Sequence, residues 1–367
     1  MGFSAKSFAQ NLRETRLQRG LTQRELGERL GFSEKTVSKW ENGASIPDIE
    51  ALFSICEVLQ TKIETLFSEG EHYYLGIDGG GTKTALMLVD ERGDVVRTLR
   101  ADACNPVDIG MESAQRILKD AIFEICRGIA FSDVTLFAGI SGGASGNTKE
   151  QLNVFFESFG FFATRSDSDN VNIIAAGLGE RDGITVILGT GFCVYTQRSL
   201  MHHRISGWGY LLDDGGSGYN LGRDALHAYF SAYDGSGEKT ALTDEIDKAY
   251  AGGAHALISY VYGKGKKAFA SFAPTVFAAC RRGDRIACEI LERNMREVAR
   301  MIEVAMREFD GRSVPIVFAG GLTHEECVVS WLERELKEKK GYSISILNEE
   351  PVTGAVILAR KLGGKRK

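Results

Sequence analysis

Apolar residues recur at helical spacing at the start of the chain. One face of the first predicted helix carries Phe8, Leu12 and Leu17, and a glycine ends this helix. Further helices are predicted over the segments "TQRELGERL", "SEKTVSKWENG" and "DIEALFSICEVL". The first of these begins at Thr22 and has Glu25 three positions later, which is the pattern of a capping box. Short helices joined by brief turns that contain glycine are typical of a helix-turn-helix bundle.

From residue 73 onward, the pattern changes to strands that alternate with helices. The segment "HYYLGIDGGGTKTALMLVD" predicts strand, glycine turn and strand, and "GITVILGTGFCVYTQ" repeats this arrangement about 110 residues later, which indicates an internal duplication. A third glycine turn, in "VPIVFAGGL", follows a strand and precedes a helix. Further strands are predicted in "DVTLFAGISGG" and "YSISILN", and helices at 110–128, 284–308, 323–338 and 352–362. The expected fold is α/β with two lobes, each containing a mixed sheet.

The composition is that of an ordinary water-soluble protein. Hydrophobic residues make up 43% and charged residues 25% of the 367 residues. No apolar run approaches the roughly 18 residues of a membrane span, and the N-terminus lacks the apolar core of a signal peptide. We therefore expect a cytoplasmic protein without a membrane partner. The seven cysteines include no CxxC pair and no Cys/His spacing typical of zinc sites, which favours reduced thiols.

The charge is distributed unevenly along the chain. A net charge of −5 argues against bulk electrostatic binding of nucleic acid. Residues 1–40, however, hold eight basic and four acidic side chains, whereas residues 41–67 hold one lysine and five acidic residues. We therefore expect a locally basic face on the helical segment.

The segment "LTQRELGERLGFSEKTVSKWENGASIPDIEALFSICEVL" resembles the XRE/Cro-type helix-turn-helix domain along its whole length. The resemblance implies DNA binding through residues 22–43, as a homodimer on a pseudo-palindromic operator. The residues expected to contact bases or phosphates are Gln23, Ser33, Glu34, Lys35, Thr36, Ser38 and Lys39. The alternative is a helical bundle that serves only packing or dimerisation.

The turn "DGGGTKT" carries the first candidate chemistry. Its three glycines let backbone N–H groups approach an anion closely, and its threonine hydroxyls add donors. The GxxxxGK[ST] spacing of a Walker A loop is missing, and a strand follows in place of a helix. Alone, the pattern also fits a plain tight hairpin. Asp78 at the strand end favours a phosphate site with Mg²⁺, because a carboxylate beside a phosphate cradle suits that ion.

The motifs "DGGGTKT", "AGISGG", "LGTG", "FAGGL" and "PVTGAVILA" occur in an order that resembles the sugar kinase, Hsp70 and actin superfamily. The closest likeness is to the BadF/BadG/BcrA/BcrD-type ATPase family, especially its N-acetylglucosamine kinase branch, over residues 72–362. It implies the ribonuclease H-like actin/hexokinase ATPase fold, whose two lobes close on ATP, Mg²⁺ and a small substrate. The residues expected to hold the nucleotide are Gly79, Gly80, Gly81, Thr82, Lys83, Thr84, Gly189, Thr190, Gly191, Gly320 and Gly321.

Phosphoryl transfer to a sugar needs a carboxylate that accepts the hydroxyl proton. Asp167 and Asp169 in "TRSDSDNVNIIAAGL" are the candidates, and both could instead serve as helix caps. The resemblance places the base just before an Ala/Gly-rich helix, which corresponds to Asp169.

The resemblance also implies a sugar site. The residues expected to bind the sugar are Asn105, Trp208 and Asp214, from "DACNPVDIG" and "SGWGYLLDDGGSGYNLG". Two positions depart from the family pattern, because Phe192 replaces the serine of "GTGS" and Gly215 replaces the glutamate of "DEGS". A bulky side chain near the phosphates and the loss of a carboxylate could each change ligand fit.

Two functions follow from these motifs. The first is a sugar-responsive DNA-binding regulator that also phosphorylates an amino sugar such as N-acetylglucosamine. The second is a regulator whose kinase-like domain has lost catalysis and only senses sugar and ATP. The iron–sulfur activator branch of the family is disfavoured by the sparse cysteines, and zinc-bearing sugar kinases by the missing Cys-rich motif.

The motifs also predict the domain boundaries. We expect the helix-turn-helix domain at 1–68, a short linker at 69–72, the first lobe at 73–168 and the second lobe at 169–367. The linker is too short to act as a free tether, so we expect the two modules to be coupled.

Overall fold

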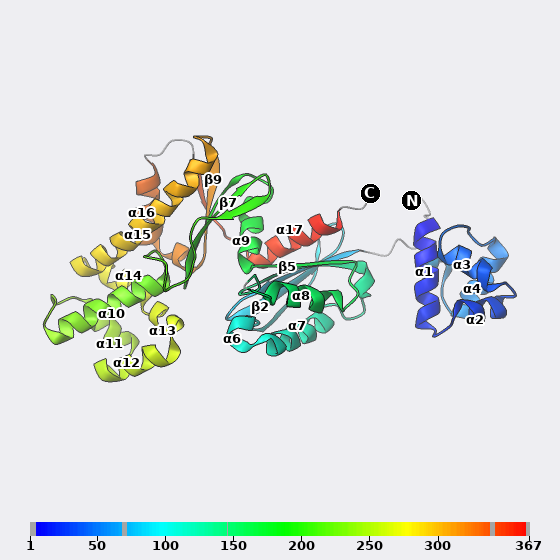
Figure 1. The fold of residues 1–367 in the computed structure, drawn as a ribbon, viewed down its shortest axis with the longest axis horizontal. Coiled ribbons are helices and arrows are strands. Elements are labelled where there is room, and N and C mark those ends of the chain that lie inside the picture. Colours follow the sequence, from blue (N-terminus) through cyan, green and yellow to red (C-terminus); the bar gives the residue numbers. More distant parts are fainter. Residues whose placement is uncertain (1–4, 68–71, 145, 338–341, 365–367) are drawn as a thin grey trace. The chain divides into compact units, whose positions relative to one another are not determined.

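The computed structural model describes residues 5–67, 72–144, 146–337 and 342–364. The chain divides into two compact units, Met1–Tyr73 and Tyr74–Lys367 (Figure 1). Most of the predicted linker at 69–72 lies outside the described residues, since these resume at residue 72.

The first unit is helical, as predicted. Its helices are α1 (Ala5–Gln18), α2 (Gln23–Leu30), α3 (Glu34–Glu41), α4 (Ile49–Leu59) and α5 (Ile63–Phe67). The predicted capping box forms at the start of α2: the Thr22 hydroxyl accepts from the Glu25 N–H, and the Thr22 N–H donates to the Glu25 carboxylate at 2.7 Å. Ser33 caps α3 and Asp48 caps α4 through a single side-chain acceptor each, so local sequence determines where these helices begin.

The core of the first unit encloses one ion pair. Phe8, Val37 and Trp40 are buried among the leucines and isoleucines of the bundle. Beside them, Arg16 on α1 binds Glu41 at the end of α3 through two hydrogen bonds of 2.6 and 2.8 Å. Both side chains are almost fully buried, so each charge depends on the other.

The described residues of the second unit form two sheets with the same strand plan. The first sheet has the order β3-β2-β1-β4-β5 and the second the order β10-β9-β6-β7-β8. If β6 is matched to β1, the two orders coincide, which supports the predicted duplication. The strands are β1 (Tyr73–Gly79), β2 (Lys83–Val89), β3 (Val95–Asp102), β4 (Val134–Ile140), β5 (Ala163–Asp167), β6 (Gly183–Leu188), β7 (Phe192–Arg198), β8 (Met201–Arg204), β9 (Val314–Ala319) and β10 (Tyr342–Ile346).

Each sheet joins an antiparallel hairpin to parallel strands. β1 pairs antiparallel with β2, and β6 with β7, so each predicted glycine turn lies at a hairpin end. β4 pairs parallel with β5, and β9 with both β6 and β10. Every residue of β4 is buried, as expected for a central strand covered on both faces.

Helices cover both sheets. They are α6 (Pro106–Ile109), α7 (Met111–Ile125), α8 (Thr148–Glu157), α9 (Asp169–Leu178), α10 (Gly218–Asp234), α11 (Leu242–Ala249), α12 (Gly253–Lys264), α13 (Lys266–Ala270), α14 (Ala273–Arg281), α15 (Arg285–Met306), α16 (Glu326–Lys337) and α17 (Pro351–Gly363). Short 3₁₀ turns lie at Phe131–Asp133, Arg307–Phe309 and Gly321–His324. The predicted helix at 323–338 therefore begins three residues later, after a 3₁₀ turn. The helical segment α10–α14 inserted into the second lobe was not predicted.

The last helix, α17, belongs to the first lobe. It packs on α9 and against β4 and β2, and appears in red beside the first sheet in Figure 1. Ala355 and Ala359 are fully buried there against Phe137. The expected second lobe at 169–367 included this helix, whereas its apolar face is buried on the first sheet.

None of the helices in the described parts of the chain is long and apolar enough to cross a membrane.

Candidate active site

A cleft of about 740 Å³ opens between the two lobes of the second unit. The turn after β1, the residues after β4 and the start of α9 line one side. The β6–β7 turn and the loop before α10 line the other. The cleft contains the following residues predicted for the site: Gly81, Thr82, Asn105, Asp169, Gly189, Thr190 and Gly191.

The first glycine turn reaches the cleft only at its tip. Gly81 and Thr82 line it, whereas Gly79 packs tightly against Cys104 and Ile140, where a β-carbon would lie 2.5 Å from either side chain. Thr84 is fully buried, and its hydroxyl donates to the Asp102 carbonyl at 2.7 Å. Thr84 therefore holds β2 to β3, and its hydroxyl is not directed at a phosphate. Lys83 is exposed and outside the lining.

The second glycine turn lines the cleft along its whole length and is held by α10. The Gly218 N–H donates to the Gly189 carbonyl at 2.8 Å, and the Tyr219 N–H donates to the Thr190 carbonyl at 3.2 Å. The first turn of α10 thus fixes the peptide groups of the turn. Gly320 and Gly321, which were also expected to hold the nucleotide, lie outside the lining; Gly320 packs on the Leu188 carbonyl just before this turn.

Asp169 lines the cleft at the first residue of α9. Ser168 is the cap residue of this helix, and its hydroxyl accepts from the Asn170 N–H. The Asp169 carboxylate accepts from the same N–H at 3.0 Å, so it also helps to cap α9. Burial raises the pKa of Asp169, and hydrogen bonds from Ser168 and Ser141 oppose that shift. A carboxylate with a raised pKa is a better proton acceptor than an exposed one.

The other candidate base, Asp167, forms ion pairs with basic side chains. Its carboxylate binds Lys149 at 2.8 Å and lies 3.7 Å from Arg165. It is outside the lining of the cleft. The geometry therefore favours Asp169, two residues away.

Asp78 lies half-buried at the end of β1. Burial raises its pKa to about 6, a shift that is opposed by a 2.8 Å hydrogen bond from Asn172 Nδ2 and reinforced by the charge of Asp169. The other amide atom of Asn172, Oδ1, is buried without a hydrogen-bond donor in the described structure. A hydrated cation beside Asp78 would favour its charged form and could supply that donor.

Asp78 lies outside the lining of the cleft, and its carboxylate would be one oxygen ligand of a magnesium ion that is shared with phosphate groups. Mg²⁺ prefers oxygen ligands and commonly uses one or two carboxylates together with substrate phosphates and water. Among the described residues, no group of three or more His, Cys, Asp or Glu side chains could hold a metal unaided. An ion at Asp78 would therefore depend on the bound nucleotide.

Of the three residues predicted to bind the sugar, only Asn105 lines the cleft. Asn105 lines the cleft and is mostly buried; its amide donates to Asp108 at 3.1 Å. Trp208 is 59% exposed, and the Arg204 guanidinium lies 3.9 Å from the centre of its ring. Asp214 is exposed and outside the lining.

Asp213, the neighbour of Asp214, does line the cleft. Its carboxylate accepts from the N–H groups of Gly207, Trp208 and Gly209 at 2.9–3.3 Å, and so shapes the loop at the cleft wall.

The two departures from the family pattern lie in well-packed surroundings. Phe192 is only 4% exposed and belongs to the core of the second lobe, where its ring lies close to Gly216. Phe192 also lines the cleft beside the second glycine turn, so its effect on ligand fit stays a prediction. A β-carbon at Gly215 would lie 3.2 Å from Glu297, so a larger residue there would need α15 to yield slightly.

Several cleft residues had not been predicted. Tyr195, Arg204, Lys266 and Lys267 all line it. Arg204 and Tyr195 lie on paired strands, and the lysines lie on the short helix α13. Adjacent lysines after a glycine were the one available sequence signal, and it is a weak one.

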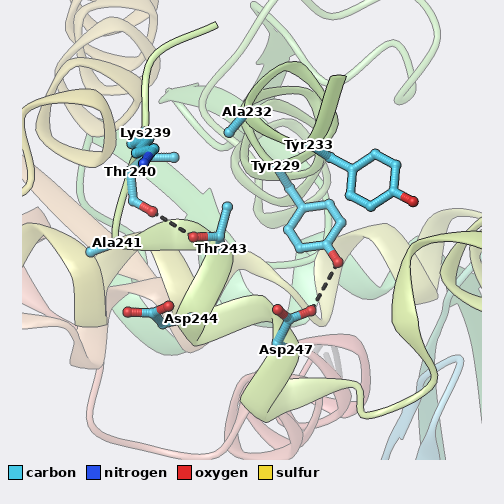
Figure 2. A pocket seen from close by; sticks show the side chains of 9 residues that line it. All are labelled: Tyr229, Ala232, Tyr233, Lys239, Thr240, Ala241, Thr243, Asp244 and Asp247. Carbon is cyan, nitrogen blue, oxygen red and sulfur yellow. Dashed lines mark hydrogen bonds between the residues drawn. The ribbon is translucent and has the colours of Figure 1, made fainter. Parts of the chain in front are cut away.

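A second hollow, of about 570 Å³, lies between α10 and α11 (Figure 2). It contains none of the predicted site residues. The Tyr229 hydroxyl donates to Asp247 at 2.8 Å, and burial together with Asp247 raises the pKa of Tyr229 to about 12. The Tyr229 phenol is therefore neutral at physiological pH, and its hydrogen bond joins α10 to α11.

In the first unit, the outward face of α3 carries the predicted DNA contacts. Glu34, Lys35 and Lys39 are exposed. Ser33 and Ser38 accept local hydrogen bonds, from the Thr36 N–H and the Asn42 amide. Gln23 is partly exposed, and its amide donates to Glu41 at 2.8 Å.

The sequences of known proteins agree with this division. The helix-turn-helix family profile matches residues 12–66. An N-acetylmuramic acid/N-acetylglucosamine kinase of Clostridium acetobutylicum is 29% identical over 304 residues, which cover 78% of this chain and 98% of that protein.

Solved structures agree in fold. A candidate N-acetylglucosamine kinase of Chromobacterium violaceum has a TM-score of 0.66 and 24% identity, and covers 79% of this chain and 99% of its own. A ROK family transcriptional regulator, a homologue of the E. coli MLC protein, has a TM-score of 0.54 and 10% identity, with 98% and 96% coverage.

The profile of the BadF/BadG/BcrA/BcrD ATPase family matches residues 75–359, which is most of the chain. This range contains both sheets apart from the first two residues of β1, and it contains both glycine turns and the cleft. The chain therefore combines a helix-turn-helix domain with an ATPase domain, and it belongs to the BadF/BadG/BcrA/BcrD ATPase family.

Proposed function

We propose that this protein is a DNA-binding regulator whose second unit transfers the γ-phosphoryl group of ATP to an amino sugar such as N-acetylglucosamine. The observation that carries the proposal is the position of Asp169, which lines the cleft together with both glycine turns. The kinase relative that spans 78% of the chain supports the substrate class.

The cleft supplies the parts that this reaction needs. Backbone N–H groups of Gly81, Thr190 and Gly191 bind the phosphates, while Asp169 accepts the proton of the sugar hydroxyl. The Gly189 N–H donates instead to the Gly191 carbonyl at 2.9 Å and holds the second turn in shape. The sugar oxygen then forms a bond to the γ-phosphorus as the bond between that phosphorus and the bridging oxygen breaks, and ADP leaves. Magnesium held by Asp78 would neutralise charge on the phosphates.

ADP release tests the catalytic part. The full chain is incubated with ATP, Mg²⁺ and a panel of amino sugars. Asp169→Asn should lower turnover at least 100-fold, because general-base catalysis typically contributes that much. Asp167→Asn is the matched control: it makes the same change two residues away, outside the cleft, and should keep most of the activity.

A sensor without catalysis is the second candidate. Gly215 favours it, because the carboxylate of the family pattern is missing beside the cleft loop. Tight binding of sugar and ATP without turnover of any sugar would establish this candidate and reject the kinase.

The DNA part is tested by binding to an operator selected from random sequences. Lys35→Ala with Lys39→Ala should weaken binding and lower the slope of log affinity against log salt by about 2, one for each lost phosphate contact. Lys62→Ala, an exposed lysine away from α3, is the control. Unchanged binding by the double variant would restrict the bundle to a structural role.

A further inference from the structure

Lys267 joins the two sides of the cleft. It lies on α13, in the helical insertion of the second lobe, and its ammonium group donates to the Gly81 carbonyl of the first glycine turn at 2.9 Å. The same ammonium lies 4.0 Å from the Asp108 carboxylate, which accepts from Asn105. One side chain of the second lobe thus contacts a carbonyl and a carboxylate of the first.

The second lobe holds α13 rigidly. Ala268 is buried, and the Phe269 ring packs on Tyr219 with ring centres 5.3 Å apart. At Gly222 on α10, a β-carbon would overlap the Phe269 carbonyl oxygen, so the two helices touch at their backbones. A small displacement of α10 would therefore move Lys267 with it.

The same helix α10 also holds the second glycine turn, through the hydrogen bonds from Gly218 and Tyr219. The second turn, α10 and α13 therefore form one packed body. Lys267 extends from this body to the tip of the first turn. Its contact with Gly81 therefore fixes the distance between the two glycine turns.

We propose that Lys267 is a positioning residue that holds the cleft closed around the nucleotide, by fixing the Gly81 turn to the second lobe. This inference rests on the proposed nucleotide site. The Lys267 side chain is 58% exposed, so water readily replaces its contact with the Gly81 carbonyl. Loss of this contact should therefore lower the population of the closed state by a moderate factor. If only the closed state binds well, the apparent affinity for nucleotide falls by the same factor.

The test compares Lys267→Ala, Lys267→Arg and Lys264→Ala in the full chain. Lys264 lies three residues away, is exposed and is outside the cleft lining, so its variant is a control for charge. Without ligand, Lys267→Ala should speed amide hydrogen exchange of residues 79–84 about three- to tenfold. It should raise KM for ATP by a similar factor and change kcat less than twofold. Lys267→Arg should restore most of the slow exchange and most of the ATP affinity, because arginine keeps a cationic donor.

The outcomes separate this inference from the kinase proposal. Faster exchange at 79–84 in Lys267→Ala, but not in Lys264→Ala, supports the closure role even if no sugar is phosphorylated. Calorimetry with ADP then gives the loss of nucleotide affinity without turnover. Equal exchange and equal ADP affinity in wild type and Lys267→Ala would overturn the inference, whatever the catalytic activity.

Discussion

Asp78 should reduce the stability of the protein at neutral pH when no metal or nucleotide is bound. Its pKa is raised from 3.8 to about 6 in the folded chain. The unfolded chain therefore releases this proton at lower pH than the folded chain does. Between about pH 4 and pH 6 the folded state binds more protons, so the free energy of unfolding falls as pH rises. Above about pH 7 the loss is complete.

The magnitude follows from the shift. The shift from 3.8 to about 6 is about 2.2 pKa units, which at 1.36 kcal/mol each correspond to about 3 kcal/mol above pH 7 and about 1 kcal/mol near pH 4.5. Asp78→Asn removes the ionisable group while keeping an oxygen that can accept from Asn172. The variant should therefore be more stable than wild type by about 2–3 kcal/mol at pH 7.5, and by much less at pH 4.5.

Urea unfolding in EDTA, followed by circular dichroism at both pH values, measures this difference. Asp167→Asn makes the same change in a carboxylate that binds Lys149, and should instead lose up to about 1 kcal/mol. No gain in the Asp78 variant at pH 7.5, or the same gain at both pH values, would refute the reasoning. The variant should also lose most of the stabilisation that Mg²⁺ and ATP give to wild type.

Three further substitutions test the packing. Glu41→Ala leaves Arg16 buried without its partner and should lower the free energy of unfolding of the first unit by about 3–5 kcal/mol in urea titration, whereas a loss below 1 kcal/mol would show that water reaches the site. Thr84→Val removes the buried hydrogen bond to Asp102 and should cost about 1 kcal/mol without changing ADP affinity in calorimetry; weaker ADP binding would return Thr84 to the phosphate site. Gly354→Ala places a β-carbon against the backbone of α9 and should lower stability by about 1–3 kcal/mol in thermal unfolding, together with turnover, because α9 carries Asp169; unchanged stability would mean that α17 shifts freely.

The elements with strong local signals were predicted well. The capping box at Thr22 and the glycine turns after β1 and β6 each depend on neighbours within a few residues. The repeated strand, turn and strand pattern likewise indicated the duplication that both sheet orders display. Such features can be predicted because the sequence window contains all the atoms that form them.

The side-chain directions at the site could be predicted only in part. Successive residues of β2 point to opposite faces, so Lys83 and Thr84 could not both reach a phosphate. The choice between Asp213 and Asp214 lies in an irregular loop, where no such alternation exists. The hydrogen bond from Gln23 to Glu41 spans 18 residues and could not be predicted from neighbouring positions. Lys267 meets Gly81 across 186 residues, a separation that no local pattern reports.

The position of α17 has a consequence for how the protein is made. The first lobe needs a helix that is translated near the end of the chain, after the whole second lobe. The helix-turn-helix unit forms its core within residues 8–66 and can fold early during synthesis. Until α17 is made, the surface of the first sheet that packs against Ala355 and Ala359 stays uncovered. The contacts between α17 and this sheet join residues far apart in sequence, which slows folding. Interrupted synthesis would therefore release a folded DNA-binding unit without a working ATPase, and chaperone demand should fall on the first lobe.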